Sequence, residues 1–297
     1  MSGIKNVIGR EKIKIDLREY ADILKNASEY AQLEIEVTIG ISENGEIRAF
    51  NQRVANGASS LNPKYVFDSL IDGEFNHIAC AAARNVAQNF GGKNNPLYLY
   101  GKEGLGKTHL LHAIGNEVLK NNPEKVVRYI TGEQFSNEFR FCIMNDITRK
   151  FRRIYRAVDL LLIDDFQRFN RSAYSQEELL NTFVELINAN KQIVIAGNCQ
   201  PQNIEGLNKK ILSRLPMTLV FGIKLPGFKE KINFLKKKAA MDGIIIPDEA
   251  VKYIARNIES NIGELKGGLA KVVAYAEVMG QDITVDLATE ALKGIVK

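Results

Sequence analysis

The sequence predicts an α/β fold in which helices cover both faces of a parallel sheet, followed by a small all-helical domain. Two observations predict the sheet. Short apolar runs alternate with helical patterns from Tyr65 to Ile223, which is typical of parallel strands joined by helices. A glycine-rich turn also separates an apolar run from a long helical pattern. A third observation predicts the helical domain, because strand patterns stop after Pro226 and helical ones continue over 227–297.

Five apolar runs are expected to form the strands of this sheet. They cover 96–100, 126–131, 158–163, 193–196 and 219–223. In the helical domain we expect breaks at Gly243–Pro247, Ser260–Gly263 and Gly280–Thr284, with Thr284 as the N-cap of a last helix.

The first 60 residues differ in pattern from the rest. Residues 10–31 predict one amphipathic helix, and apolar residues alternate over 33–41 as in a strand. Ser42–Gly45 favours a hairpin turn, after which 46–50 returns as a second strand. The polar stretch 51–60 is the best linker candidate. We therefore expect a helix-hairpin module at 1–55, the α/β core at 56–226 and the helical domain at 227–297.

Composition limits the classes to which the protein can belong. The 297 residues are 45% hydrophobic and 25% charged, as in ordinary globular proteins, and no apolar run approaches the length of a membrane helix. No secretion signal is evident at the start of the chain. Three widely spaced cysteines form neither a disulfide framework nor a metal-ligand pattern. We expect a cytoplasmic protein without a membrane partner, and its net charge of +5 allows anionic partners.

The turn Gly101–Thr108 is a complete G-x-x-x-x-G-K-[ST] phosphate loop between an expected strand and an expected helix. Its glycines let backbone N–H groups point at a phosphate, and the helix N-terminus adds partial positive charge. Lys107 would reach the β- and γ-phosphates, and Thr108 would hold Mg²⁺. The expected ligand is ATP or ADP with Mg²⁺. The residues expected to contact it are Gly101, Gly104, Leu105, Gly106, Lys107, Thr108 and His109.

Two carboxylates end the expected strand at 158–163, which places them at the edge of the sheet where ligands of open α/β folds bind. Asp164 would hold the Mg²⁺ shell and Asp165 would orient or activate the attacking water. Asn198, after the next strand, would polarise the same water. The alternatives are a solvated strand end for the two acids and an ordinary turn residue for Asn198.

Several motifs, in their order, closely resemble the bacterial replication initiator DnaA family. They are Leu61–Asp68, Asn95–Gly101, Gly104–Asn116, Val158–Gln167 and Ser175–Glu178, and the resemblance extends to Lys297. It implies an AAA+ ATPase core with a helical lid. It also implies an adenine pocket lined by Tyr65, Phe67, Asp68 and Asn76. Arg214, just before the last strand, would be an arginine finger that reaches the γ-phosphate of an adjacent subunit, and the alternative is a surface arginine.

The family has an extra helix pair after the second strand, which corresponds here to Glu133–Cys142 and Ile147–Arg156. In initiators this insertion touches single-stranded DNA, so the resemblance implies non-specific binding of single strands. The alternative is a solvated helix face. The basic residues that would contact phosphates are Arg140, Arg149, Lys150, Arg152, Arg153 and Arg156.

The chain departs from the family pattern at four places. The lid motif Arg-Glu-Leu-Glu-Gly is here Gly263–Gly267, so the arginine that senses the γ-phosphate is missing. Ser172–Tyr174 replaces the usual Lys-x-Arg, which removes one contact to single strands. Gly197-Asn198 replaces Ser-Asp, a change that many AAA+ proteins share. The box-reading domain that follows the lid is absent, so sequence-specific duplex binding is not expected.

These features lead to one main hypothesis and three others. The main one is a DnaA-like AAA+ protein, a slow ATPase with a weakened lid sensor, that regulates or assists initiation of chromosomal replication. Its expected partners are its own copies or a related AAA+ replication protein, and the N-terminal module would bind another replication protein. The others are a helicase loader, a nucleotide-dependent scaffold with little hydrolysis, and a fragment of a true initiator, against which the missing sensor arginine argues.

Overall fold

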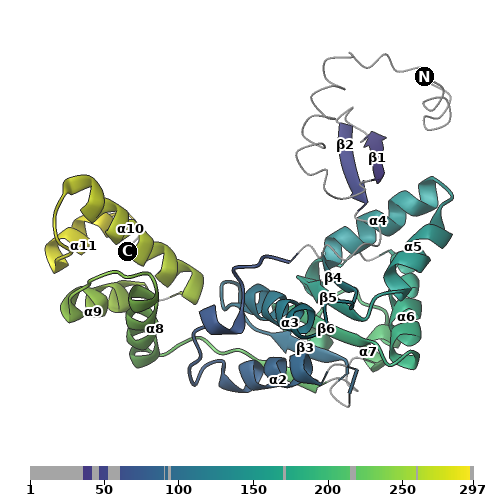
Figure 1. The fold of residues 1–297 in the computed structure, drawn as a ribbon, viewed down its shortest axis with the longest axis horizontal. Helices are drawn as coiled ribbons and strands as arrows, with labels where there is room; N and C mark the ends of the chain where they lie inside the picture. The colour runs from purple at the N-terminus through teal and green to yellow at the C-terminus, as the bar shows by residue number, and fades with distance from the viewer. Residues whose placement is uncertain are drawn as a thin grey trace. The chain divides into compact units, whose positions relative to one another are not determined.

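The computed structural model describes residues 36–41, 47–52, 61–89, 91–92, 95–169, 172–214, 219–258 and 260–294. The chain divides into two compact units, Met1–Ala58 and Ser59–Lys297. In the first unit, β1 (Glu36–Ile41) pairs antiparallel with β2 (Ile47–Gln52), as the alternating pattern predicts (Figure 1). The predicted turn at 42–45 and the predicted helix at 10–31 lie outside the described residues.

The second unit is built on a five-stranded sheet in the order β4-β5-β6-β3-β7, in which every neighbouring pair is parallel (Figure 1). The predicted fold class is thereby confirmed, and the predicted strands differ from the observed ones by one or two residues at their ends. The observed strands are β3 (Leu97–Tyr100), β4 (Val127–Thr131), β5 (Leu160–Asp164), β6 (Gln192–Gly197) and β7 (Leu219–Gly222).

Alternate strand residues face two separate cores, which is why the strands are apolar on both sides. Leu97 and Leu99 belong to the core under α2 (His77–Gln88) and α3 (Lys107–Asn121). Tyr98, which lies between them in the strand, faces the opposite core, together with residues of the other helices that cover the sheet. Those helices are α4 (Gly132–Met144), α5 (Thr148–Arg156), α6 (Ala173–Asn188) and α7 (Lys209–Arg214), and short 3₁₀ turns occur at η1 (Phe67–Ser69), η2 (Phe166–Arg168) and η3 (Pro201–Asn203).

The inserted pair α4 and α5 packs against the edge of the sheet through aromatic rings. Phe135 on α4 lies edge-on to Phe151 and Tyr155 of α5, with ring centroids 5.1 and 4.9 Å apart. Arg128 of β4 donates to Glu138 of α4 at 2.9 Å, and the Tyr155 hydroxyl donates to the same carboxylate at 2.6 Å. Hydrogen bonds that link charged groups of neighbouring elements favour one arrangement of those elements. The insertion is therefore anchored to β4 as a preformed unit.

The lid is a bundle with a core of its own, formed by α8 (Phe228–Met241), α9 (Asp248–Asn257), α10 (Ile262–Met279) and α11 (Val285–Leu292). Thr284 accepts a hydrogen bond from the Leu287 amide at 3.1 Å, which confirms the predicted N-cap. The break expected at 260–263 lies two residues earlier, at 258–261, because Asn261 already caps α10. Throughout the described ranges, no helix combines the length and apolar character that crossing a membrane requires.

Candidate nucleotide-binding site

The phosphate loop lies between β3 and α3 and is held open by left-handed glycines. Gly104 has φ of +74° and Gly106 has φ of +86°, values that side chains with a Cβ rarely adopt. A Cβ added at Gly106 would meet no atom within 4 Å, so space remains beside the start of α3. Leu105 points into the core and anchors the loop between these glycines. The loop can therefore present backbone amides to an anion in that space.

Lys107 contacts the backbone of the phosphate loop through its ammonium group. Its Nζ donates to the carbonyls of Gly101 at 2.7 Å and Lys102 at 2.8 Å, and only 7% of the residue is exposed. Burial lowers the pKa of Lys107, while the nearby carboxylates of Asp164 and Asp165 act in the opposite direction. A bound phosphate would provide the opposite charge that the two carbonyls only partly supply.

Asp164 ends β5 beside the first turn of α3. Its Oδ2 accepts from the Thr108 hydroxyl at 2.6 Å and from the Tyr129 hydroxyl at 3.0 Å, and its Oδ1 accepts from the Asp165 amide at 2.8 Å. Burial and Asp164 raise the pKa of Tyr129 well above its ordinary value, so the phenol remains a donor.

The Thr108 hydroxyl and the Asp164 carboxylate fit Mg²⁺, which prefers a hydroxyl or carboxylate combined with phosphate oxygens and water. In the described part of the chain, no three His, Cys, Asp or Glu residues are grouped to hold a metal ion by themselves. Thr108 and Asp164 would thus hold Mg²⁺ only together with a nucleotide.

Asp165 and the Asn198 backbone are joined by a residue to which the sequence assigned no role. Gln167 donates to Asp165 Oδ1 at 3.0 Å and accepts from the Asn198 amide at 3.0 Å. Asp165 itself has φ of +47°, so the chain turns sharply after the strand. Asn198 is exposed. Gln167 thereby links the carboxyl ends of β5 and β6. In the sequence, its position two residues after Asp164-Asp165 is the feature from which this role could have been inferred.

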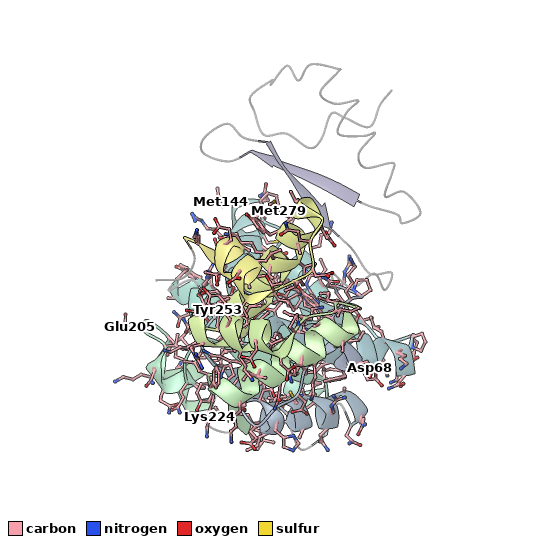
Figure 2. All side chains as sticks on the ribbon, turned by 90° about the vertical axis from the view of Figure 1, so that its left-hand side faces the viewer. Asp68, Met144, Glu205, Lys224, Tyr253 and Met279 are labelled. Carbon is pink, nitrogen blue, oxygen red and sulfur yellow. The ribbon has the colours of Figure 1, made fainter. Side chains whose placement is uncertain are left out.

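The residues expected on the adenine side have different environments. Tyr65 stacks on His109 with ring centroids 4.9 Å apart, and Asp68 is exposed (Figure 2). Phe67 is buried, with the Arg84 guanidinium 4.7 Å from its ring centre. Asn76 is also buried and holds its own loop, since it accepts from the Gly73 amide at 2.8 Å and donates to the Ile71 carbonyl at 3.1 Å.

His109 and His112 on α3 fasten the residues around Tyr65. His109 Nε2 lies 2.9 Å from the Val66 carbonyl and 3.2 Å from the Ser69 hydroxyl, and His112 Nδ1 accepts from the Asn62 amide at 3.1 Å. Burial lowers the pKa of both imidazoles, which keeps them neutral and fits these bonds.

The lid touches the phosphate loop at Gly263, the position at which the sequence resemblance implies a sensor arginine. The Gly263 amide donates to the Gly104 carbonyl at 3.0 Å. This amide is one of the first four of α10, which have no partner inside the helix. A Cβ at Gly104 would lie 2.3 Å from Asn261 Oδ1, so a side chain there would displace the Asn261 side chain that caps α10. Backbone atoms therefore make the contact at this position.

The six basic residues of the insertion divide into two sets. Arg152 and Arg156 bind the same carboxylate, Glu178, at 2.9 Å each, and Glu178 is 2% exposed. Arg152 is nevertheless exposed, as are Arg140, Arg149 and Arg153, whereas Lys150 is half-buried. Met144 at the end of α4 is also exposed (Figure 2). Two of the six residues thus serve the attachment of α5 to α6.

Arg214 is the last residue of α7, and its side chain lies outside the described part of the structure. The buried side chain of Gln176 on α6 forms hydrogen bonds with the backbone just before α7. Its Nε2 donates to the Gly206 carbonyl at 2.8 Å and its Oε1 accepts from the Asn208 amide at 2.5 Å. Asn208 Oδ1 in turn accepts from the Lys210 amide at 2.9 Å. The helix that ends in Arg214 is therefore fixed to α6.

Comparison with known proteins identifies the family. A family model described as the bacterial DnaA ATPase domain matches residues 61–222. Domain III of the replication initiation protein DnaA from Thermotoga maritima is 36% identical, with a TM-score of 0.75 over 80% of this chain and 99% of that one. The chain belongs to the bacterial DnaA family. The resemblance seen in the sequence motifs of this chain is thereby confirmed.

Two further solved DnaA structures are similar to this chain. AMPPCP-bound DnaA from Aquifex aeolicus is 31% identical, with a TM-score of 0.69 over 74% of this chain and 68% of that one. A DnaA bound to AMPPCP and single-stranded DNA is 29% identical, with the same TM-score over 74% and 69%. The Thermotoga maritima branch migration motor RuvB, at 19% identity and a TM-score of 0.56 over 77% and 71%, shares the fold.

Proposed function

We propose that this DnaA-family protein binds ATP or ADP with Mg²⁺ at the phosphate loop and regulates or assists the initiation of chromosomal replication. The observation that supports binding most directly is that Lys107 rests on the loop backbone and Thr108 bonds to Asp164 at the start of α3, next to a loop with open space at Gly106. Solved relatives in the same family carry AMPPCP. The proposed parts are the module at 1–55, the AAA+ core at 56–226 and the lid at 227–297.

The residues would divide the work of a slow ATPase. Lys107 binds the β- and γ-phosphates, and Mg²⁺ held by Thr108 and Asp164 would neutralise phosphate charge. Asp165, kept in place by Gln167, would orient the attacking water from one strand end, and Asn198 would polarise it from the next. Tyr65, Phe67, Asp68 and Asn76 form or support the adenine side.

Assembly would complete this site through Arg214 of an adjacent copy or of a related AAA+ replication protein. The first unit would bind another replication protein, as in the alternative role of a helicase loader. A nucleotide-dependent scaffold with little hydrolysis is a second candidate, and the Gly263 contact favours it. A lid that already touches the loop through backbone atoms has no side chain at that position with which to read the γ-phosphate.

The isolated protein is expected to bind ATP and ADP with affinities within about tenfold, or about 1.4 kcal/mol. A ligand shifts an equilibrium only through different interactions with the two states, and Gly263 offers the γ-phosphate no charge. Titration calorimetry below the assembly concentration measures both affinities. Assembly that requires ATP should appear at higher concentration in ultracentrifugation and vanish in Arg214→Ala. A monomer that prefers ATP a hundredfold would contradict this, and Arg256 or Lys266 would then be the next residues to replace.

We also propose weak, sequence-independent binding of single-stranded DNA by the insertion, as the DNA-bound DnaA relative suggests. Replacing Arg140, Arg149 and Arg153 together with glutamate is expected to abolish it, because the change removes three exposed positive charges that can contact phosphates. Each such contact contributes roughly −0.7 to the slope of log affinity against log salt. Arg152 and Arg156 are left intact, since they bind Glu178. Fluorescence anisotropy with a labelled oligothymidine measures the binding.

The matched control for the DNA experiment moves the same charge change to the lid. Lys229, Lys252 and Lys271 are exposed there, and replacing all three with glutamate alters the net charge equally. This variant should keep most of the binding. Equal losses in both variants would show that only the overall charge matters. Strong, sequence-selective duplex binding by the wild-type protein would contradict the proposal.

A further inference from the structure

The Asp164 carboxylate is almost completely buried and receives three hydrogen bonds, of which the one from Tyr129 has no part in the function proposed above. Asp164 is 3% exposed, and its Oδ2 is shared between Thr108 and Tyr129. The third bond comes from the Asp165 amide to Oδ1. A carboxylate that ligates a metal ion needs a fixed orientation, and neighbouring donors provide it.

Tyr129 is itself held by the helix that carries Thr108. It lies on β4, where Thr131 pairs with Asp164 of β5, so its hydroxyl reaches the end of the neighbouring strand. Its ring lies 4.2 Å, centroid to centroid, from the His112 ring on α3. His112 is four residues after Thr108 and therefore on the same helix face. The phenol is thus packed between β4 and α3, with its oxygen 3.0 Å from Asp164.

His112 cannot easily move away from Tyr129. Its Nδ1 accepts from the Asn62 amide at 3.1 Å, and Tyr65 packs against its ring with centroids 5.6 Å apart. Only 5% of the residue is exposed. The position of the Tyr129 hydroxyl is therefore determined from both sides, by its strand and by a fixed imidazole.

We propose that Tyr129 is a positioning residue for Mg²⁺: its hydroxyl holds Asp164 Oδ2 in the orientation in which the carboxylate and Thr108 share the ion. This inference rests on the proposed function, because it requires a nucleotide with Mg²⁺ at the loop. When the Thr108 oxygen faces a metal ion, Tyr129 remains as a second donor to the same carboxylate oxygen. Without it, that oxygen keeps a single bond and the carboxylate gains freedom to rotate.

The test is the Mg²⁺ dependence of nucleotide binding in Tyr129→Phe, which removes the hydroxyl and keeps the ring against His112. Fluorescence of N-methylanthraniloyl-ADP measures affinity in EDTA and then against increasing free Mg²⁺. We expect affinity in EDTA to stay within twofold of wild type. The Mg²⁺ concentration at half-maximal effect is expected to rise about tenfold, the lower end of the effect of removing such an outer donor.

Tyr100→Phe is the matched control. Tyr100 ends β3 at the same edge of the sheet, and its hydroxyl accepts from Gln200 Nε2 at 2.9 Å instead of contacting Asp164. This variant should keep the wild-type Mg²⁺ dependence. A general loss of affinity in EDTA by Tyr129→Phe, or an equal change in Tyr100→Phe, would overturn the assignment, because it would indicate a structural role.

A double-mutant comparison shows whether Tyr129 acts through Asp164. In an Asp164→Asn background, adding Tyr129→Phe should shift the Mg²⁺ dependence by less than twofold, since residues of one network are not additive. A tenfold shift in that background, or no shift in the wild-type background, overturns the inference. If the wild-type protein fails to bind the nucleotide at all, the proposed function itself fails, which separates the two results.

Discussion

Lys107→Ala is expected to lower nucleotide affinity at least a hundredfold, equivalent to about 2.7 kcal/mol. Lys107 is a buried cation whose Nζ rests on two carbonyls of the phosphate loop, ready to exchange them for phosphate oxygens. A charge-assisted bond to phosphate is stronger than the neutral ones it replaces. Titration of the variant with labelled ADP in the presence of Mg²⁺ gives the affinity directly.

The control for this experiment lies in the same loop. Lys102 is exposed, and the loop uses its carbonyl and not its ammonium group. Lys102→Ala should therefore change affinity less than threefold. If Lys107→Ala binds as tightly as wild type while it remains folded by circular dichroism, the nucleotide site lies elsewhere in the protein.

Glu178→Ala is expected to destabilise the second unit by about 2 kcal/mol, because it removes charge-assisted hydrogen bonds to two arginines that remain partly exposed to water. Glu178 is 2% exposed and binds both Arg152 and Arg156 of α5. Its loss leaves two arginines without their shared carboxylate, and Arg156 retains only a longer contact of 3.7 Å to Glu185. Urea unfolding followed by circular dichroism measures the change in unfolding free energy.

Glu177, the preceding residue on α6, is the control because it is exposed. Glu177→Ala should change the unfolding free energy by no more than about 0.5 kcal/mol. A loss below 1 kcal/mol in Glu178→Ala would mean that water solvates the two arginines as well as the carboxylate does. Arg152→Glu should also destabilise the protein, since it removes one of the two partners of Glu178 and brings a second negative charge near this buried carboxylate.

Local sequence patterns carried most of the information about the sheet. Each strand of the sheet is a short apolar run in the sequence. In β5 the run ends with Asp164, the acidic residue that lies at the carboxyl end of the strand. The phosphate loop could be predicted because its residues are consecutive. Thr284 as an N-cap is equally local, since its partner is the amide three residues later.

Contacts between residues distant in the chain could not be predicted in this way. Glu178 meets Arg152 and Arg156 only once α5 and α6 pack, so a row of arginines in the sequence suggested six equivalent phosphate contacts. Tyr129 reaches Asp164 from a neighbouring strand, 35 residues away. The hydrogen bond from the Gly263 amide to the Gly104 carbonyl forms only when α10 approaches the phosphate loop. The absence of an arginine from the sequence does not by itself reveal this approach.

The contact of Gly263 with the phosphate loop has a consequence for the design of a variant that carries a side chain there. A Cβ at Gly263 would lie 3.1 Å from Asn261 Oδ1 and 3.5 Å from the Gly104 Cα. The Asn261 oxygen is also the one that caps α10 through the Glu264 amide. An arginine at this position would therefore require the Asn261 side chain to shift by a few tenths of an ångström, while its Cβ would make ordinary van der Waals contact with Gly104. The backbone contact between α10 and the loop leaves room for a side chain at residue 263, provided that the cap of α10 adjusts to it.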